Sequence, residues 1–169
     1  ALSAGSPLTH HLQASFYVPL EALAVRPDSV GGVPHVAHCL IQRLLSGSAA
    51  QAPPGGAPLL LLQSEGVFRI TADADDVDAM RRQIDAGPAA AAAAVNACTD
   101  PHLLATTLKG WLRKLPAPLI PVAAYRQLVA LGQAEPTATS AEGLPALVRG
   151  LPPPNLLTLH ALFELLGAV

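Results

Sequence analysis

The fold of this chain is decided by residues 100–116, which read DPHLLATTLKGWLRKLP. Asp100 has a side chain that caps helices well, and Pro101 suits the first helical position, so a helix is predicted to begin here. At about 100° per residue, its apolar side chains fall in one arc. These are Leu104, Leu108, Trp111, Leu112 and Leu115. Pro116 then ends the helix, because proline cannot continue one. The pattern predicts a central helix with one buried stripe.

Two cations stand beside that stripe. Lys109 and Arg113 are four residues apart, which places them together on the helix, roughly 100° or more from the centre of the apolar arc. The helix is therefore expected to bury one face and to present two positive charges next to it. From the residues alone, a solvated basic face is favoured over a binding site as the explanation of this pair.

A second informative stretch is SEGVFRIT, residues 64–71. Gly66 permits a tight or left-handed turn. Val67, Phe68 and Ile70 are apolar and are expected to anchor the loop on the core. Arg69 is costly to bury without a partner. The stretch therefore predicts a fixed loop that offers one guanidinium to an anion, unless Arg69 pairs with a carboxylate or a helix C-terminus, as structural arginines commonly do.

Composition narrows the class of protein. The chain has 169 residues, of which 51% are hydrophobic and only 4% aromatic. This length fits one domain, and a core of Leu, Val and Ala favours packed helices, so the fold is expected to be all-α. A formal net charge of −2 gives no reason to expect nucleic-acid binding. Two cysteines, Cys39 and Cys98, are too few for a disulfide framework and suit a reducing, cytoplasmic compartment.

No apolar run reaches the roughly 18–20 residues of a membrane span, and no signal peptide is apparent. The sequence also lacks a phosphate-binding glycine loop, a Ser/His/Asp order and zinc-ligand spacing. His35 and His38 lie three apart on a predicted helix, without a third ligand nearby. We expect no metal site and no hydrolase activity of the chain itself.

Further helices follow from apolar periodicity and from capping residues. One opens at Pro34, in the first helical position, and one is capped by Asp73 or Asp75 and runs to about Ala86. The alanine-rich run 89–94 is either a helical turn or a loop. Later helices are expected at 122–131, with Gly132 as the stop, at 140–150, and after 155. Their predicted inward side chains are Tyr125, Leu128 and Val129; Leu144, Leu147 and Val148; and Leu156, Leu159, Leu162, Phe163 and Leu166.

Three blocks of sequence resemble the RhoGAP domain, the module that stimulates GTP hydrolysis by Rho-family small GTPases. The first is Gly66-Val67-Phe68-Arg69, similar to the arginine-finger loop. The second, residues 108–121, reads LKGWLRKLPAPLIP, and the third, residues 151–159, reads LPPPNLLTL. The resemblance covers residues 16–169, and the amino-acid sequence of the loop is similar to that of the plant and MyTH4-linked branches of the family. It leaves 1–15 as a linker or flexible arm and 46–58 as a low-complexity insertion.

The resemblance implies an all-α, RhoGAP-like helical bundle that inserts Arg69 into the active site of a GTPase. Gly66, Lys109, Arg113 and Asn155 match residues that support the loop or bind the GTPase, although Asn155 is also placed to cap the last helix. The partner would be a Rho-, Rac-, Cdc- or Rop-type GTPase in its GTP-bound form. That partner supplies the Mg²⁺ and the GTP, so the chain itself needs no cofactor. Domains outside this chain could recruit it to membranes.

The sequence departs from the family pattern in two places. Thr71-Ala72 stands where Ser-Gly usually follows the finger arginine. Family domains also continue beyond the position of Val169 with further helices, so we expect a bundle that lacks its C-terminal helices and leaves leucines and phenylalanine of the last helix partly uncovered. Both departures motivate an alternative, a catalytically inactive module that binds a GTPase or another signalling partner. A weaker alternative is a helical bundle that holds an apolar ligand.

Overall fold

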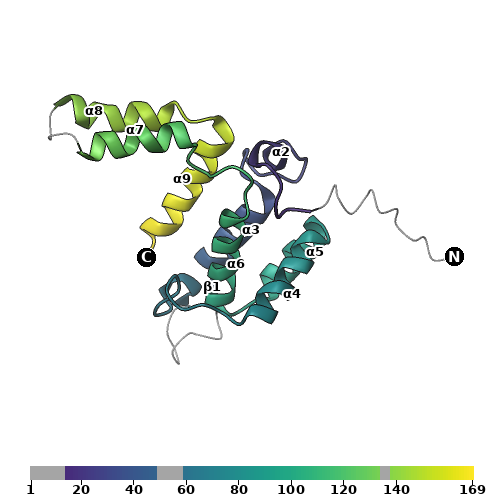
Figure 1. Cartoon of the computed structure of the whole chain (residues 1–169). Coiled ribbons are helices and arrows are strands. Elements are labelled where there is room, and N and C mark those ends of the chain that lie inside the picture. The colour runs from purple at the N-terminus through teal and green to yellow at the C-terminus, as the bar shows by residue number, and fades with distance from the viewer. Residues whose placement is uncertain (1–13, 49–58, 134–137) are drawn as a thin grey trace.

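The computed structural model describes residues 14–48, 59–133 and 138–169. These residues form an all-α fold (Figure 1). Its helices are α2 (Leu20–Ala24), α3 (His35–Leu45), α4 (Ala74–Asp85), α5 (Pro88–Ala97), α6 (Pro101–Arg113), α7 (Val122–Gln133), α8 (Ala138–Arg149) and α9 (Pro153–Gly167). The predicted fold class is therefore confirmed. Most of the predicted arm, 1–13, and of the predicted insertion, 49–58, lies outside the described residues, as does 134–137.

One small β element interrupts the helices. The strand β1 (Gly47–Ser48) pairs antiparallel with β2 (Leu59–Leu60), and a 3₁₀ helix, η2 (Leu61–Gln63), follows directly. The first two residues after Ser46 in the predicted insertion are thus part of a strand pair. This pair leads the chain from α3 to the loop that carries Arg69.

The core forms where α3 and α4 pack against α5 and α6, with α9 lying on the other side of α3. Trp111 of α6 is fully buried, as the apolar arc of 100–116 predicts. Leu104 and Leu108 of the same arc are 0% and 2% exposed. The buried side chains of α3 recur at helical spacing and are Val36, Ala37, Leu40, Ile41 and Leu44. The position of α6 at the centre of the fold follows from this stripe.

The predicted helix starts are mostly confirmed. The side chain of Asp73 accepts a hydrogen bond from the Asp75 amide at 2.9 Å, and that of Asp100 accepts one from the His102 amide at 2.8 Å. Pro34 stands one residue before α3 rather than in its first turn. The alanine-rich run belongs to a complete helix, α5, which begins at Pro88.

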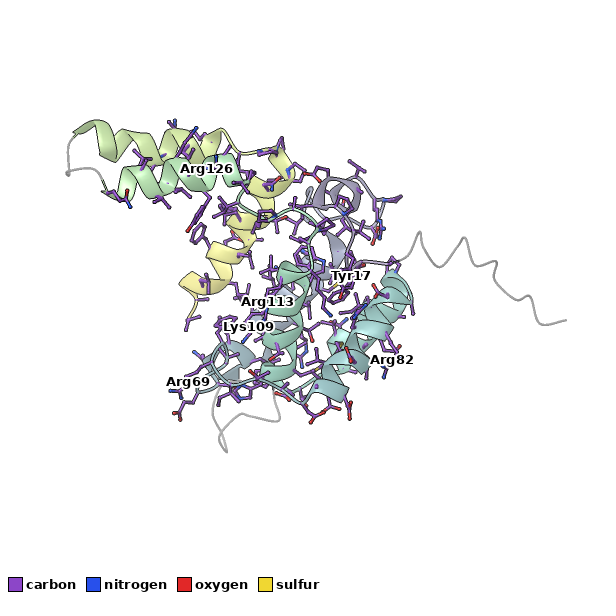
Figure 2. The ribbon with its side chains drawn as sticks, viewed as in Figure 1. Tyr17, Arg69, Arg82, Lys109, Arg113 and Arg126 are labelled. Carbon is purple, nitrogen blue, oxygen red and sulfur yellow. The ribbon has the colours of Figure 1, made fainter. Side chains whose placement is uncertain are left out.

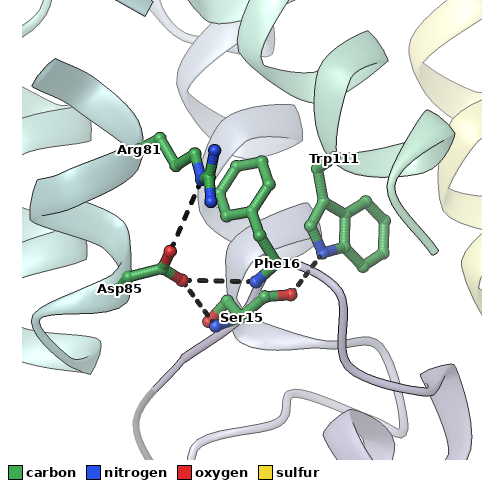
Figure 3. A network of polar contacts seen from close by, with 5 residues as sticks. All are labelled: Ser15, Phe16, Arg81, Asp85 and Trp111. Atoms are coloured by element: carbon green, nitrogen blue, oxygen red, sulfur yellow. Dashed lines mark hydrogen bonds and ion pairs between the residues drawn. The ribbon is translucent and has the colours of Figure 1, made fainter. Parts of the chain in front are cut away.

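The N-terminal segment is tied to α4 and α6 (Figure 3). Asp85 accepts hydrogen bonds from the amides of Ser15, at 2.7 Å, and Phe16, at 3.2 Å. The indole N–H of Trp111 donates to the carbonyl of Ser15 at 3.0 Å. Arg81 lies 3.7 Å from Asp85 and above the ring of Phe16. Ser15, expected at the end of the arm, is thus fixed to the body of the fold.

The predicted inward faces of α7 and α8 are wrong in part. Tyr125 and Val129 are 59% and 39% exposed, and Leu144 is 49% exposed. Helix α7 packs mainly against α8, and Figure 1 shows the pair extending away from α4 and α5. Because no third layer covers this pair in the described residues, apolar side chains on its outer faces stay in solvent. Gly132 does not stop α7 but lies inside it.

An apolar groove of about 840 Å³ lies along α7 and α8. Small side chains line most of it, among them Ala123, Ala124, Ala130 and Ala146. None of the described residues forms a helix with the length and hydropathy that a membrane crossing needs.

Helix α9 also differs from its prediction. It begins at Pro153 with Pro152 at the cap, so the predicted cap role of Asn155 is wrong. The physical reason is that Pro153 and Pro154 occupy the first two helical positions, where they have no N–H to be capped, and they place Asn155 inside the first turn. Leu165 is buried, whereas Phe163 and Leu166 are 60% and 52% exposed. Partly uncovered apolar residues on this helix were expected.

Candidate functional site

The loop 64–72 is wound tightly by its own backbone. The amides of Arg69 and Ile70 both donate to the carbonyl of Gly66 at 2.8 Å, and the Val67 amide donates to the carbonyl of Ser64 at 3.3 Å. Gly66 has a φ of 70°, which is the left-handed region that its position in the sequence suggests. A short chain of hydrogen bonds therefore fixes the residues on both sides of Gly66.

Two apolar side chains anchor this loop, and a third does not. Val67 is buried, at 4% exposed, and Phe68 is half-buried against the core. The expected burial of Ile70 is wrong, since its side chain is 46% exposed. The reason is local: Ile70 folds back over Gly66, where a Cβ atom would come within 3.0 Å of the Ile70 Cδ1.

Arg69 projects from the loop into solvent (Figure 2). Within the described part of the chain its guanidinium has no ion-pair or hydrogen-bond partner. The alternative reading, an arginine that folds back onto a carboxylate, is not what these residues show. A guanidinium that is exposed and unpaired keeps all its donors available for an anion.

Helix α6 holds this loop through two hydrogen bonds to backbone atoms. The ammonium of Lys109 donates to the carbonyl of Phe68 at 2.9 Å. The amide of Ala72 donates to the hydroxyl of Thr106 at 3.2 Å. Thr106 was not singled out from the sequence. Its spacing of three residues from Lys109, which puts both on one face of α6, is the signal that could have found it.

Arg113 extends the same face of α6 by one turn beyond Lys109. Its Nε donates to the carbonyl of Lys109 at 3.3 Å, and the side chain is exposed. Figure 2 shows Arg69, Lys109 and Arg113 following one another along one side of the molecule. We call these three residues the finger surface. No acidic side chain among the described residues is ion-paired to it, so it is suited to a negatively charged partner.

The structure does not bring Asn155 to the finger surface. Its side chain is 4% exposed, and its amide nitrogen donates to the carbonyl of Leu119 at 2.8 Å. Its amide oxygen is buried, with no hydrogen-bond partner among the described residues. The geometry supports a role in fastening the 116–121 corner to α9. Contact of Asn155 with a GTPase stays a prediction, and it would require this side chain to become accessible.

Histidines and cysteines form no metal centre in the described ranges, where no three metal-binding side chains come together. The thiol of Cys39 lies 3.3 Å from Nε2 of His35. Burial raises the pKa of the Cys39 thiol, and the nearby charge of Asp28 raises it further. Burial also raises the pKa of Cys98. Thiols with raised pKa values are poor nucleophiles near neutral pH.

Known proteins that are similar to this chain in sequence and fold indicate its family. A family model described as the RhoGAP domain matches residues 60–169. The chain is 32% identical over 158 residues to the Rho GTPase-activating protein gacY of Dictyostelium discoideum, covering 93% of this chain and 20% of that protein. It is 29% identical over 106 residues to human Bargin, covering 63% of this chain and 15% of that protein.

The fold is similar to a crystal structure of human Rho GTPase activating protein 15. The TM-score is 0.68 at 21% sequence identity, over 98% of this chain and 72% of the solved one. The chain spans only a minor part of the length of the two curated relatives, and 72% of the solved chain. Because the family model matches well over half of its residues, this chain belongs to the RhoGAP domain family.

Proposed function

We propose that this chain stimulates GTP hydrolysis by a Rho-family small GTPase, with Arg69 as an arginine finger supplied in trans. The observation that carries the proposal is the state of Arg69: exposed, without a partner in the described residues, and borne on a loop that α6 fixes on both sides of it. The names of two similar proteins, the Rho GTPase-activating protein gacY and human Rho GTPase activating protein 15, support the same class of partner.

The guanidinium acts by electrostatics. As the γ-phosphoryl group leaves, negative charge develops on its oxygens and on the leaving group, and a cation placed there stabilises the transition state more than the ground state. In Ras, a finger supplied in trans is worth about 10³–10⁵ in rate, or roughly 4–7 kcal/mol of barrier. Arg69 contributes charge and forked donors, while the partner supplies the Mg²⁺ and the residue that orients the attacking water.

The other residues of the finger surface have supporting roles in this proposal. Lys109 holds the carbonyl of the residue directly before Arg69, which limits where the guanidinium can reach. Arg113 is exposed beside it and docks on acidic groups of the GTPase. The preferred partner is a Rho-, Rac-, Cdc- or Rop-type GTPase carrying GTP, and the chain itself binds neither nucleotide nor metal.

The test is single-turnover phosphate release from a panel of GTP-loaded Rho-family GTPases, with this chain or its Arg69→Ala variant added. We expect acceleration by the parent and a loss of about 10³-fold or more in the variant, with modestly weaker binding. Arg82→Ala is the matched control, because Arg82 is an exposed arginine on α4, well apart from Arg69 in Figure 2. It should accelerate release as the parent does.

Two results would contradict the proposal. If Arg69→Ala stimulates as well as the parent, Arg69 is not the finger. If the parent binds a GTP-loaded GTPase without hastening phosphate release from any member of the panel, the chain is an interaction module instead.

A further inference from the structure

We propose that Thr106 is a second positioning residue for the arginine finger, and that it fixes the end of the loop that Lys109 does not reach. The inference rests on the proposed function, because a finger must exist to be positioned. The Thr106 hydroxyl accepts the Ala72 N–H at 3.2 Å, and its side chain is only 7% exposed. The bond is part-buried, and the side chain at its Thr106 end is buried.

The two contacts of α6 lie on opposite sides of Arg69. Lys109 holds the Phe68 carbonyl, one residue before the arginine, and Thr106 holds the Ala72 amide, three residues after it. A loop held at one point can pivot about that point in any direction, whereas a loop held at two points can rotate only about the line that joins them. The pair therefore limits both the position and the direction of the segment that carries the guanidinium.

The support for these contacts is rigid. Thr106 and Lys109 lie one turn apart on α6, and the neighbouring side chains Leu104, Ala105 and Leu108 are buried in the core. Threonine is β-branched, which restricts rotation about its χ1 angle. In a helix threonine divides between two χ1 rotamers, so the helix limits the hydroxyl to two directions, and the bond to the Ala72 amide is made in one of them.

The chemistry needs a hydroxyl at this position. A half-buried backbone N–H left without an acceptor costs free energy, so the loop is stabilised in the arrangement that pairs the Ala72 amide. Valine has nearly the same shape as threonine but cannot accept a hydrogen bond. Serine can accept one, although its χ1 angle is less restricted. These two substitutions separate the hydrogen bond from the packing of the side chain.

Thr107, the residue after Thr106 in the sequence, provides a matched control. Thr107 is 1% exposed, and its hydroxyl donates to the carbonyl of Leu103 within α6 rather than to the loop. Thr107→Val makes the same chemical change as Thr106→Val, one residue along the helix. Any effect of losing a buried hydroxyl from α6 in general should appear in both variants.

The first measurement is hydrogen exchange of the Ala72 amide by NMR, in the free protein. Thr106→Val should exchange about fivefold or more faster than the parent, which is the scale set by losing one internal hydrogen bond. Thr106→Ser should stay within about twofold of the parent, and so should Thr107→Val. An unchanged exchange rate in Thr106→Val would overturn the inference without any reference to a GTPase.

The second measurement separates positioning from docking. Single-turnover hydrolysis is followed at rising concentrations of the chain, to give a maximal rate and a half-saturating concentration. Thr106→Val should lower the maximal rate by about five- to tenfold. Its half-saturating concentration should stay unchanged, because a side chain that is 7% exposed offers no surface to the partner. Thr106→Ser should restore most of the maximal rate.

The outcomes distinguish this inference from the proposed function. If Arg69→Ala abolishes stimulation while Thr106→Val leaves the maximal rate intact, the function stands and the inference fails. If the parent stimulates no GTPase, both fail together. A rise in the half-saturating concentration alone would assign Thr106 to docking and would also overturn the inference. Unfolding curves of each variant confirm that the rates are compared between folded proteins.

Discussion

At the scale of single residues, Gly66 sets the path of the chain into Arg69. Its φ of 70° is rarely adopted by residues with a Cβ, and a Cβ at this position would also come within 3.0 Å of the Ile70 Cδ1. Both constraints fix the backbone at Gly66, whose carbonyl accepts hydrogen bonds from the amides of Arg69 and Ile70. The direction of the chain at Arg69 therefore depends on a residue that has no side chain.

Gly66→Ala is expected to lower the free energy of unfolding by about 1–2 kcal/mol, which is the usual cost of the left-handed region for an L-residue. It should also reduce stimulation of the GTPase, because relief of the strain rotates the loop. Urea unfolding and single-turnover phosphate release measure the two effects. Gly132→Ala is the control: a Cβ there meets nothing within 4 Å inside α7, so stability should rise by about 0.5–1 kcal/mol. Equal stability of parent and Gly66→Ala would contradict the argument.

A substitution at Asn155 tests whether this asparagine stabilises the fold or binds the GTPase. Removing its side chain leaves the carbonyl of Leu119 without its donor in a half-buried position. Asn155→Ala should therefore lower the free energy of unfolding by about 1–3 kcal/mol, measured by urea unfolding. The half-saturating concentration for GTPase stimulation should change little. Asn96→Ala, at an exposed asparagine of α5, should alter neither quantity. A raised half-saturating concentration at unchanged stability would instead mark Asn155 as a GTPase contact.

At the scale of elements, local signals in the sequence explain α4 and α6 but not α7. Asp73 and Asp100 cap their helices as predicted, because capping depends on neighbours in the chain. The inward face of α7 depends on what packs against it, and in the described residues that is mainly α8. Apolar periodicity alone predicted that Tyr125 and Val129 are buried, but both are exposed. The prediction that Asn155 caps α9 is wrong for a local reason, because the two prolines before it occupy the first two helical positions.

In the candidate site, too, local features could be predicted from the sequence, whereas contacts between distant residues could not. Gly66 and Arg69 could be identified from eight residues, since a glycine turn and a projecting cation are local features. The bonds from α6 to Phe68 and Ala72 could not, because they join residues 41 and 34 positions apart. On the side of the loop the bonded atoms are a backbone carbonyl and a backbone amide, which carry no signal in a sequence. The resemblance implied a supporting role for Lys109, and the shared face of Lys109 and Thr106 was the hint at Thr106.

Helix α7 is expected to open more readily than α6. None of its described residues is buried, whereas seven residues of α6 are. Opening α7 therefore exposes little new apolar surface, and its amides are exchanged by local fluctuations rather than by global unfolding. Amide hydrogen exchange by NMR should show protection at least about tenfold lower in α7 than in α6. Comparable protection in the two helices would mean that α7 is held by contacts beyond those seen here.

At the scale of the whole molecule, the two thiols link stability to pH. Both have a pKa raised above the ordinary value of 9.0, chiefly by burial. A raised pKa in the folded state means that the folded chain binds these protons more tightly than the unfolded chain does. The contribution is therefore fully present below pH 9.0 and is lost as the pH rises through the folded-state pKa values.

Urea unfolding at pH 8 and pH 10 checks this sign. The free energy of unfolding should fall between the two, and fall less in a variant that carries Cys39→Ala and Cys98→Ala together. The double variant isolates the thiols from tyrosines and lysines, which also titrate in alkali. Single-tryptophan fluorescence reports the transition, since Trp111 is the one tryptophan of the chain and is buried in the core. An equal fall in parent and variant would assign the pH dependence to other groups.

The anchors from α6 also bear on how this loop can change over evolution. They hold a carbonyl and an amide, groups that every residue other than proline possesses. Side chains at positions 71 and 72 can therefore drift without loosening the loop, provided that proline does not arrive at 72. Thr71-Ala72 in place of the family's Ser-Gly is a change of this tolerated kind. Selection on the geometry of the loop is thereby transferred to Thr106 and Lys109, which the loop sequence itself does not contain.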